Sequence, residues 1–186
     1  MFDLGPASDD LARLVRGVRD DQLDAPTPCT EWPLGSLLAH IHQFATVFTA
    51  NAQKVPPAPV AGLPADWRRV IPLRLDDLVQ AWHDPSAWQG RVSAGGVEMT
   101  GEENAVVAIE ELVVHGWDVA RASGQDFRPA AESLDHVERF LDVFAGPIES
   151  GKGPYGPAVT VGADASRVDR YLAAAGRDPA WSPPGA

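Results

Sequence analysis

A carboxylate and an imidazole recur at helical spacing in the second half of the chain. Glu111 and His115 are four residues apart, and Asp118 follows three residues later. On a helix these spacings place the three side chains next to one another on successive turns. A carboxylate and an imidazole from one helix suit Zn²⁺ or another divalent first-row ion. The pattern predicts part of a metal site, although a solvated helix edge or a hydrogen-bonded pair would have the same spacing.

Two histidines in another apolar segment are candidates for a third ligand. His40 and His42 lie two residues apart, so on a helix they point to different sides and only one can join the site. His40 shares its side with Leu37 and Phe44, whereas His42 is next to Thr46. The helical wheel favours His40 and leaves His42 open. Two histidines, one glutamate and an open fourth position are typical of catalytic rather than structural zinc.

The segment that carries Glu111 and His115 must be central in the fold. Residues 105–120 are apolar on nearly all sides of a helix, which is typical of a buried helix. Glu111, His115 and Asp118 form a polar stripe on this helix. Val107 and Val114 border the stripe, so we expect it to be at least partly buried. Buried charges need partners or a metal. Burial therefore favours the metal over the solvated edge.

The remaining periodicity predicts a mainly α fold. We expect helices over residues 8–23, 30–54, 74–84, 102–123, 130–145 and 164–175. Ser8 is the expected N-cap of the first, and Gly124 closes the fourth. Residues 55–64 contain four prolines and predict a crossover loop. We also expect a β-hairpin over 88–101 and a short strand over 158–161.

Length and composition indicate one domain. The 186 residues, 45% of them hydrophobic, fit a single globular unit. We expect a bundle core over about 8–146, followed by a C-terminal loop and helix over 147–181. Four substantial helices with a proline-rich connection after the second predict a four-helix bundle with one long crossover.

Charge and composition also exclude classes of partner. The net charge of −11, without a cluster of Lys and Arg, argues against nucleic acid. No apolar run approaches the roughly 20 residues that span a bilayer, and the N-terminus does not resemble a signal peptide. The single Cys29 cannot form an internal disulfide, which fits a reducing compartment. We therefore expect a cytoplasmic protein without membrane or nucleic-acid partners, and a homodimer stays open.

Two segments resemble a known family. They are residues 27–40, Thr-Pro-Cys-Thr-Glu-Trp-Pro-Leu-Gly-Ser-Leu-Leu-Ala-His, and residues 111–124, Glu-Leu-Val-Val-His-Gly-Trp-Asp-Val-Ala-Arg-Ala-Ser-Gly. Both resemble signature segments of the DinB-like metal-binding family, in the branch of the N-terminal domain of mycothiol-dependent maleylpyruvate isomerase. Residues 175–181 also look like the ending of a single-domain, uncharacterised subgroup of that branch. The resemblance spans about residues 8–181.

The resemblance implies a fold and a ligand set. The fold is a DinB-like four-helix bundle with a long crossover, here with a small hairpin and extra C-terminal helices. The bundle holds a divalent metal, usually taken as zinc. Carried over residue by residue, the ligands are His40, Glu111 and His115, the set that the helical wheel also favours. We expect Asp118 to orient a ligand or a bound water.

The resemblance also implies chemistry on a low-molecular-weight thiol, mycothiol. A metal at such a site stabilises a thiolate and so creates a nucleophile near neutral pH. We expect a metal-dependent thiol S-transferase or isomerase acting on a small electrophile. The isomerase has a separate C-terminal domain for which 186 residues leave no room, and this weighs against carrying over its reaction. A non-catalytic metal-binding module and a metal-dependent hydrolase, with Glu110 or Asp118 as a nominal base, are the alternatives.

Overall fold

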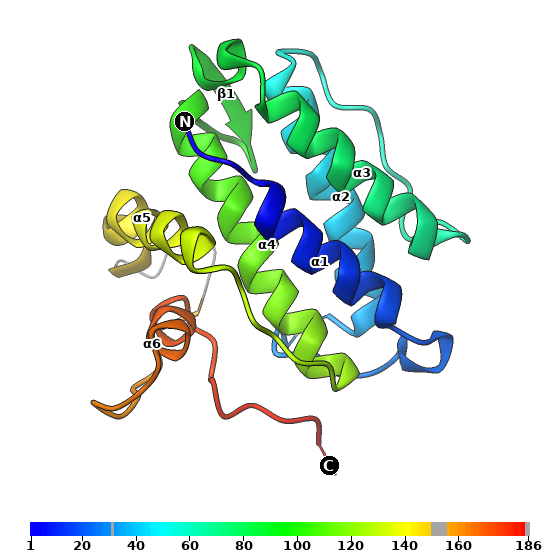
Figure 1. Cartoon of the computed structure of the whole chain (residues 1–186), viewed down its shortest axis with the longest axis vertical. Helices are drawn as coiled ribbons and strands as arrows, with labels where there is room; N and C mark the ends of the chain where they lie inside the picture. The colour runs from blue at the N-terminus through cyan, green and yellow to red at the C-terminus, as the bar shows by residue number, and fades with distance from the viewer. Residues whose placement is uncertain (31, 150–155, 185–186) are drawn as a thin grey trace.

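The chain is mainly helical, as the sequence predicted (Figure 1). The computed structural model describes residues 1–30, 32–149 and 156–184. Its helices are α1 Gly5–Gly17, α2 Leu34–Ala52, α3 Trp67–Trp82, α4 Gly101–Ser123, α5 Ala131–Glu149 and α6 Arg167–Ala174. Two short 3₁₀ turns, Asp20–Gln22 and Pro85–Trp88, and a hairpin of β1 Arg91–Ala94 and β2 Val97–Thr100 complete the described elements.

The first four helices form the bundle. Helix α4 packs against α1 and α2, and α3 packs against both α1 and α2. Helix α5 packs on α4 from outside this group, with α6 next to α5 (Figure 1). Residues 53–66 connect α2 to α3 without helix or strand and run back along the bundle, so the predicted crossover is confirmed (Figure 1).

Helix α4 is buried along most of its length because its sequence is apolar on nearly every side. Its first turn is closed by a capping box, in which the Thr100 hydroxyl accepts from the Glu103 backbone N–H and the Glu103 carboxylate accepts from that of Thr100. At its other end Gly124 adopts φ +72°, the left-handed conformation that glycine tolerates best. Both ends therefore follow from local sequence, and they fix where the polar stripe lies.

The hairpin sits against the start of α4. Its strands pair antiparallel, with Arg91 opposite Thr100 and Ala94 opposite Val97. Gly95 and Gly96 both have positive φ, which a two-residue turn of this kind requires. The prediction of a hairpin over 88–101 is confirmed.

Several element boundaries differ from the sequence predictions. Ser8 is not an N-cap, because α1 begins at Gly5 and the buried Ser8 hydroxyl donates to the Leu75 carbonyl instead, at 3.3 Å. Helix α1 ends at Gly17, not near residue 23, and α2 begins at Leu34, because Pro33 is extended and stands as its N-cap.

Helix α3 is longer than the sequence predicted. It begins at Trp67, not near residue 74, and continues through Pro72. Trp67, Ile71 and Leu75 are buried at helical spacing, so packing outweighs the hydrogen bond that proline removes.

The prediction of a strand over 158–161 is wrong. These residues form no strand, and the Val159 backbone N–H donates to the Ala173 carbonyl of α6 at 2.9 Å. Helix α5 extends to Glu149, beyond the predicted residue 145, and residues 150–155 of the predicted loop lie outside the described part. The last helix is shorter than predicted and starts after Ser166, whose hydroxyl caps it.

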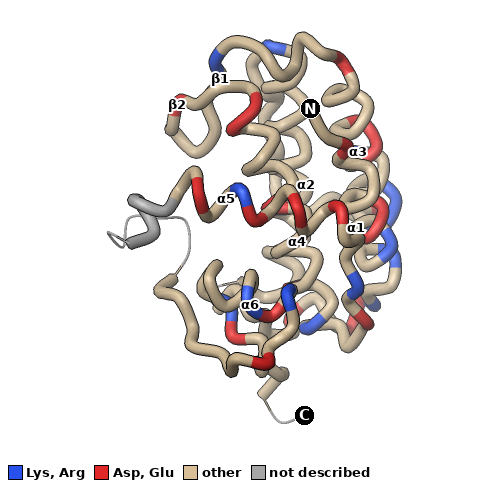
Figure 2. The backbone as a smooth tube through the Cα atoms, turned by 60° about the vertical axis from the view of Figure 1, so that its left-hand side comes forward, with Lys and Arg blue, Asp and Glu red and all other residues tan. Residues whose placement is uncertain are grey.

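Charged residues of both signs are interspersed along α1, α3 and α6 in the view of Figure 2. No helix of the described residues combines the length and apolarity that a membrane crossing demands.

Candidate metal centre

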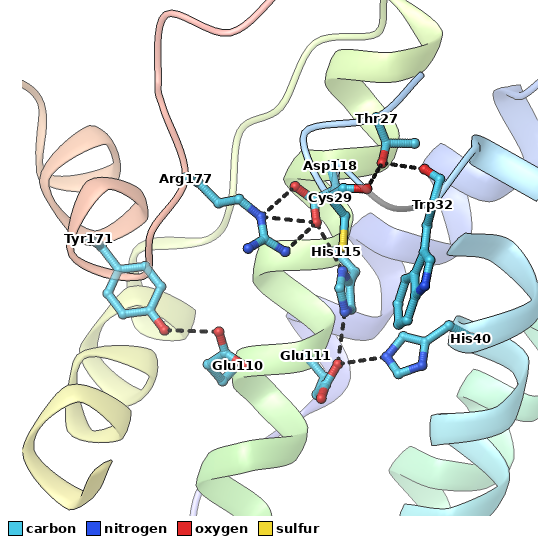
Figure 3. Close-up of polar contacts among 10 residues, drawn as sticks. All are labelled: Thr27, Cys29, Trp32, His40, Glu110, Glu111, His115, Asp118, Tyr171 and Arg177. Atoms are coloured by element: carbon cyan, nitrogen blue, oxygen red, sulfur yellow. Dashed lines mark hydrogen bonds and ion pairs between the residues drawn. The ribbon is translucent and has the colours of Figure 1, made fainter. Parts of the chain in front are cut away.

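Helices α2 and α4 bring His40, Glu111 and His115 together (Figure 3). One ligand atom from each lies within 4.8 Å of the others. Glu111 Oε2 is 3.0 Å from His115 Nε2 and 3.3 Å from His40 Nε2. The stripe on α4 therefore faces the histidine of α2 that the helical wheel favoured.

His42 does not join this cluster. Its Nδ1 is buried and has no hydrogen-bond partner within the described residues. The two-residue offset on α2 turns its ring away from the three side chains, so the structure separates two histidines that the sequence left as alternatives.

The cluster is buried at one end and reachable at the other. The His115 side chain is only 5% exposed, whereas those of Glu111 and His40 are 19% and 25% exposed. A small molecule can therefore approach the cluster beside Glu111 and His40, while His115 forms its base.

Aromatic rings surround the two imidazoles. The Trp32 ring lies 4.6 Å from that of His40, and the Phe44 ring lies 5.7 Å from His40 and 6.3 Å from His115, centroid to centroid. These rings restrict the rotation of both imidazoles and lower the local dielectric, which strengthens electrostatic interactions within the cluster.

A second carboxylate orients His115 from behind. Asp118 Oδ2 is 3.0 Å from His115 Nδ1, and Asp118 is fully buried. When Nδ1–H donates to Asp118, the lone pair of Nε2 is directed toward Glu111. This carboxylate–histidine arrangement is the one that fixes the ring of a metal-bound histidine in many sites.

Asp118 is in turn held by Arg177, which lies after α6. Arg177 Nε is 3.0 Å from Asp118 Oδ1, and Nη2 is 3.0 Å from Oδ2. The role of Arg177 was not predicted from the sequence. Arg177 stood within the segment 175–181 noted for its resemblance, but the 59 residues between it and Asp118 hide the pairing.

The electrostatics of the cluster favour charged forms despite burial. Burial alone would raise the pKa of Glu111, but hydrogen bonds with His115 and His40 outweigh it and hold that pKa well below its usual range. Burial would lower the pKa of His115, but hydrogen bonds to Asp118 and Glu111 raise it to about 10. Burial also opposes ionisation of Asp118, and contacts with His115 and Arg177 lower its pKa. These shifts favour a protonated His115 between the two carboxylates when no ion is bound.

Glu110 lies on another side of α4. Its Oε1 accepts from the Tyr171 hydroxyl of α6 at 3.5 Å, and burial raises the pKa of that hydroxyl. Glu110 is therefore directed away from His40 and His115, toward the C-terminal helix (Figure 3).

A cavity of about 270 Å³ opens beside His40. It lies between α2 and the crossover and is lined by Trp32, Ser36, Ala39, His40, Gln43, Val60 and Gly62. Among the described residues that line it, His40 alone is ionisable, and Ser36 and Gln43 supply neutral hydrogen-bonding groups.

The donor spacing fits a tetrahedral ion. Bonds of about 2.0–2.2 Å to nitrogen and oxygen, at tetrahedral angles, separate neighbouring donors by about 3.3–3.6 Å. The two contacts of Glu111 Oε2 have nearly this length, 3.0 and 3.3 Å. His40, Glu111 and His115 could hold such an ion with only small movements of their side chains.

Comparisons with known proteins identify a matching family and two similar proteins. The sequence model of the family described as mycothiol maleylpyruvate isomerase N-terminal domain matches residues 4–120. Two uncharacterized proteins from two strains of Mycobacterium tuberculosis are each 34% identical to this chain over 130 residues. The match covers 64% of this chain and 64% of each relative, so the chain spans less than two thirds of the relatives' length. No solved structure matches the chain significantly.

Proposed function

The chain belongs to the mycothiol maleylpyruvate isomerase N-terminal domain family, and from this premise we propose that it binds zinc through His40, Glu111 and His115. The observation that carries the proposal is the convergence of two imidazole nitrogens and one carboxylate oxygen within 4.8 Å. This donor set is one that zinc accepts. The Nδ1 contact of His115 with Asp118 supports it, because that contact leaves Nε2 free to act as a ligand.

The proposed site is catalytic rather than structural. Three protein ligands leave one tetrahedral position for a small molecule. Among the described residues the ligand cluster has no fourth member, and Asp118 is already engaged by Arg177 and His115. The partial exposure of Glu111 and His40 supports an open position on their side of the cluster. We therefore favour this reading over a non-catalytic metal-binding module.

The proposed small molecule is a thiol of the mycothiol type, and the proposed reaction is a thiol S-transfer or isomerisation of a small electrophile. The family description supports the thiol. A bound divalent ion would lower the pKa of such a thiol and hold it as the thiolate. The chain's own residues would hold the ion, with Asp118 orienting His115 and with Trp32 and Phe44 keeping water from the base of the site. The cavity beside His40 offers room for part of a neutral, polar molecule.

A metal-dependent hydrolase is the weaker alternative. Hydrolysis needs a general base close to the attacking water. Asp118 is held by Arg177 and His115, and Glu110 contacts Tyr171. Neither of these two carboxylates is placed for that role, which favours thiol chemistry.

The proposal is tested by the metal content of three purified proteins. We expect one zinc per chain in the wild type, no zinc in His40→Ala, and one zinc in His42→Ala. The two histidines lie on the same helix, so His42→Ala controls for the loss of an imidazole from α2. Zinc retained in His40→Ala, or absent from the wild type, would contradict the proposed ligand set.

The same proteins test the reaction. We expect conjugation or isomerisation with mycothiol across a panel of small electrophiles in the wild type and in His42→Ala. Activity should disappear after removal of zinc with a chelator and return when zinc is restored. Activity that survives chelation and the His40→Ala change would exclude the metal from the reaction.

A further inference from the structure

Arg177 links the C-terminal segment to the candidate metal centre. It is only 7% exposed and contacts both oxygens of Asp118, through Nε at 3.0 Å from Oδ1 and Nη2 at 3.0 Å from Oδ2. A guanidinium that binds a carboxylate through two nitrogens fixes the plane of that carboxylate as well as its position. Asp118 therefore cannot rotate freely within its buried site.

This contact continues directly into the proposed ligand set. Asp118 Oδ2 is 3.0 Å from His115 Nδ1, and His115 Nε2 is 3.0 Å from Glu111 Oε2. Figure 3 shows Arg177, Asp118, His115 and Glu111 as one continuous series of polar contacts along α4. An arginine from the end of the chain thus lies two contacts away from the Nε2 atom that would bind the ion.

The backbone holds Arg177 in this place. Gly176 has φ +73°, and a Cβ there would lie 2.6 Å from the Gly156 carbonyl oxygen, so the turn needs glycine. The Arg177 backbone N–H donates to the Leu172 carbonyl at 2.8 Å. Four residues later the Trp181 carbonyl accepts from Arg121 Nε of α4 at 2.9 Å. The segment is therefore anchored on both sides of Arg177.

We propose that Arg177 is a positioning residue of the metal centre, which acts through Asp118 to set the ring orientation of His115. The inference rests on the proposed zinc binding, and it assigns part of the site to a segment beyond residues 4–120 that match the family. A buried ion pair is by itself a weak source of stability compared with apolar packing. What the guanidinium adds is a fixed Asp118 carboxylate, and hence a fixed lone pair on His115 Nε2.

Removing the guanidinium should weaken zinc binding without removing a ligand. Groups that hold a metal-bound histidine from behind contribute about 10–100-fold to metal affinity. Arg177 contacts Asp118 and not His115 itself, so we expect Arg177→Gln to weaken zinc binding by the lower end of this range, about tenfold. It should also change the ligand-field spectrum of the Co²⁺-substituted protein, because that spectrum responds to the direction of the His115 lone pair.

The decisive measurement is a double-mutant cycle on zinc affinity. Dissociation constants are measured by competition with a chromophoric chelator for wild type, Arg177→Gln, Asp118→Asn and the double variant. If Arg177 acts through Asp118, Arg177→Gln should weaken binding less than about twofold in the Asp118→Asn background. Arg167→Gln is the matched control, because Arg167, at the start of α6, makes a two-nitrogen contact with Glu138 of α5 and contacts neither Asp118 nor a proposed ligand.

Each outcome decides the proposal. Wild-type affinity and an unchanged Co²⁺ spectrum in Arg177→Gln overturn it, as does an equal loss with and without Asp118 or an equal loss in Arg167→Gln. If Arg177→Gln does not fold, Arg177→Lys is judged by the same criteria, because lysine keeps the charge but cannot make the two-nitrogen contact. A wild type that binds no zinc overturns the proposed function, whereas zinc binding insensitive to Arg177 overturns this inference alone.

Discussion

His115 is a proposed ligand whose ring also contacts two carboxylates. Without an ion it lies between Asp118 and Glu111, and the two carboxylates stabilise its protonated form. A metal ion bound to Nε2, as we propose, would displace the proton on that nitrogen. Because the two carboxylates stabilise the protonated ring, His115 must lose a proton before it can bind the ion.

This competition predicts that zinc affinity rises with pH. The pKa of His115 is raised to about 10 by its hydrogen bonds, which outweigh burial, so near neutrality binding releases one proton. The zinc association constant should then increase about tenfold per pH unit. Competition titrations between pH 6.5 and 7.5, corrected for the chelator's own protonation, measure this slope. A slope near zero would mean that His115 is already neutral in the metal-free protein.

The raised pKa of His115 also determines how the free energy of unfolding of the metal-free protein changes with pH. The folded-state pKa of His115 lies above the ordinary value of 6.5. Its contribution to the free energy of unfolding is therefore complete below pH 6.5 and is lost as the pH rises toward about 10.

Among the elements, α4 follows the sequence prediction most closely, and it carries Glu111, His115 and Asp118 of the candidate site. The sequence carries its capping box, its C-terminal glycine and its apolar periodicity, and all three are local signals. The local signals at Pro72 and Ser8 predicted the wrong helix starts because packing outweighs the local signal at each. The contact of Arg177 with Asp118 could not be predicted, since no local pattern encodes a pairing across 59 residues.

The close packing at the start of α4 predicts the effect of one glycine substitution. A Cβ at Gly101 would lie 2.5 Å from the Ala87 carbonyl oxygen and 2.6 Å from the Trp88 carbonyl carbon, and backbone atoms cannot move aside cheaply. Gly101→Ala should lower the free energy of unfolding by about 1–3 kcal/mol, measured by urea denaturation.

Gly116 on the same helix is the control. A Cβ there would meet only the Phe127 ring edge at 3.3 Å and a Leu14 methyl at 3.8 Å, and side chains can yield. Because alanine is the better helix former, Gly116→Ala should leave stability unchanged or raise it. Equal losses in both variants would contradict the packing that the structure shows at Gly101.

At the scale of the whole molecule, the proposed ion would join helices that are distant in the chain. His40 and Glu111 are separated by 71 residues, and their two helices pack side by side. An ion that binds only the folded arrangement stabilises the entire bundle by mass action. The metal is therefore expected to influence global unfolding as well as chemistry.

This linkage predicts a thermal shift. Zinc at about one hundred times its dissociation constant should add about 2.7 kcal/mol to the free energy of unfolding. For a domain of this size that raises the Tm by roughly 5–10 °C. Differential scanning calorimetry with and without zinc measures the shift, and Glu111→Gln should abolish it. An equal shift in Glu111→Gln would place the zinc elsewhere.

The division of the site between one helix and two loop-connected segments bears on how distant relatives can be recognised. Glu111, His115 and Asp118 share α4, so their spacing is set by the helical turn and tolerates no insertion. His40 and Arg177 reach α4 through surface connections, including the crossover over 53–66, where the chain can gain or lose residues at little cost. A search for the same site in diverged sequences should therefore hold the four- and three-residue spacings constant. It should leave the intervals to the α2 histidine and the C-terminal arginine free.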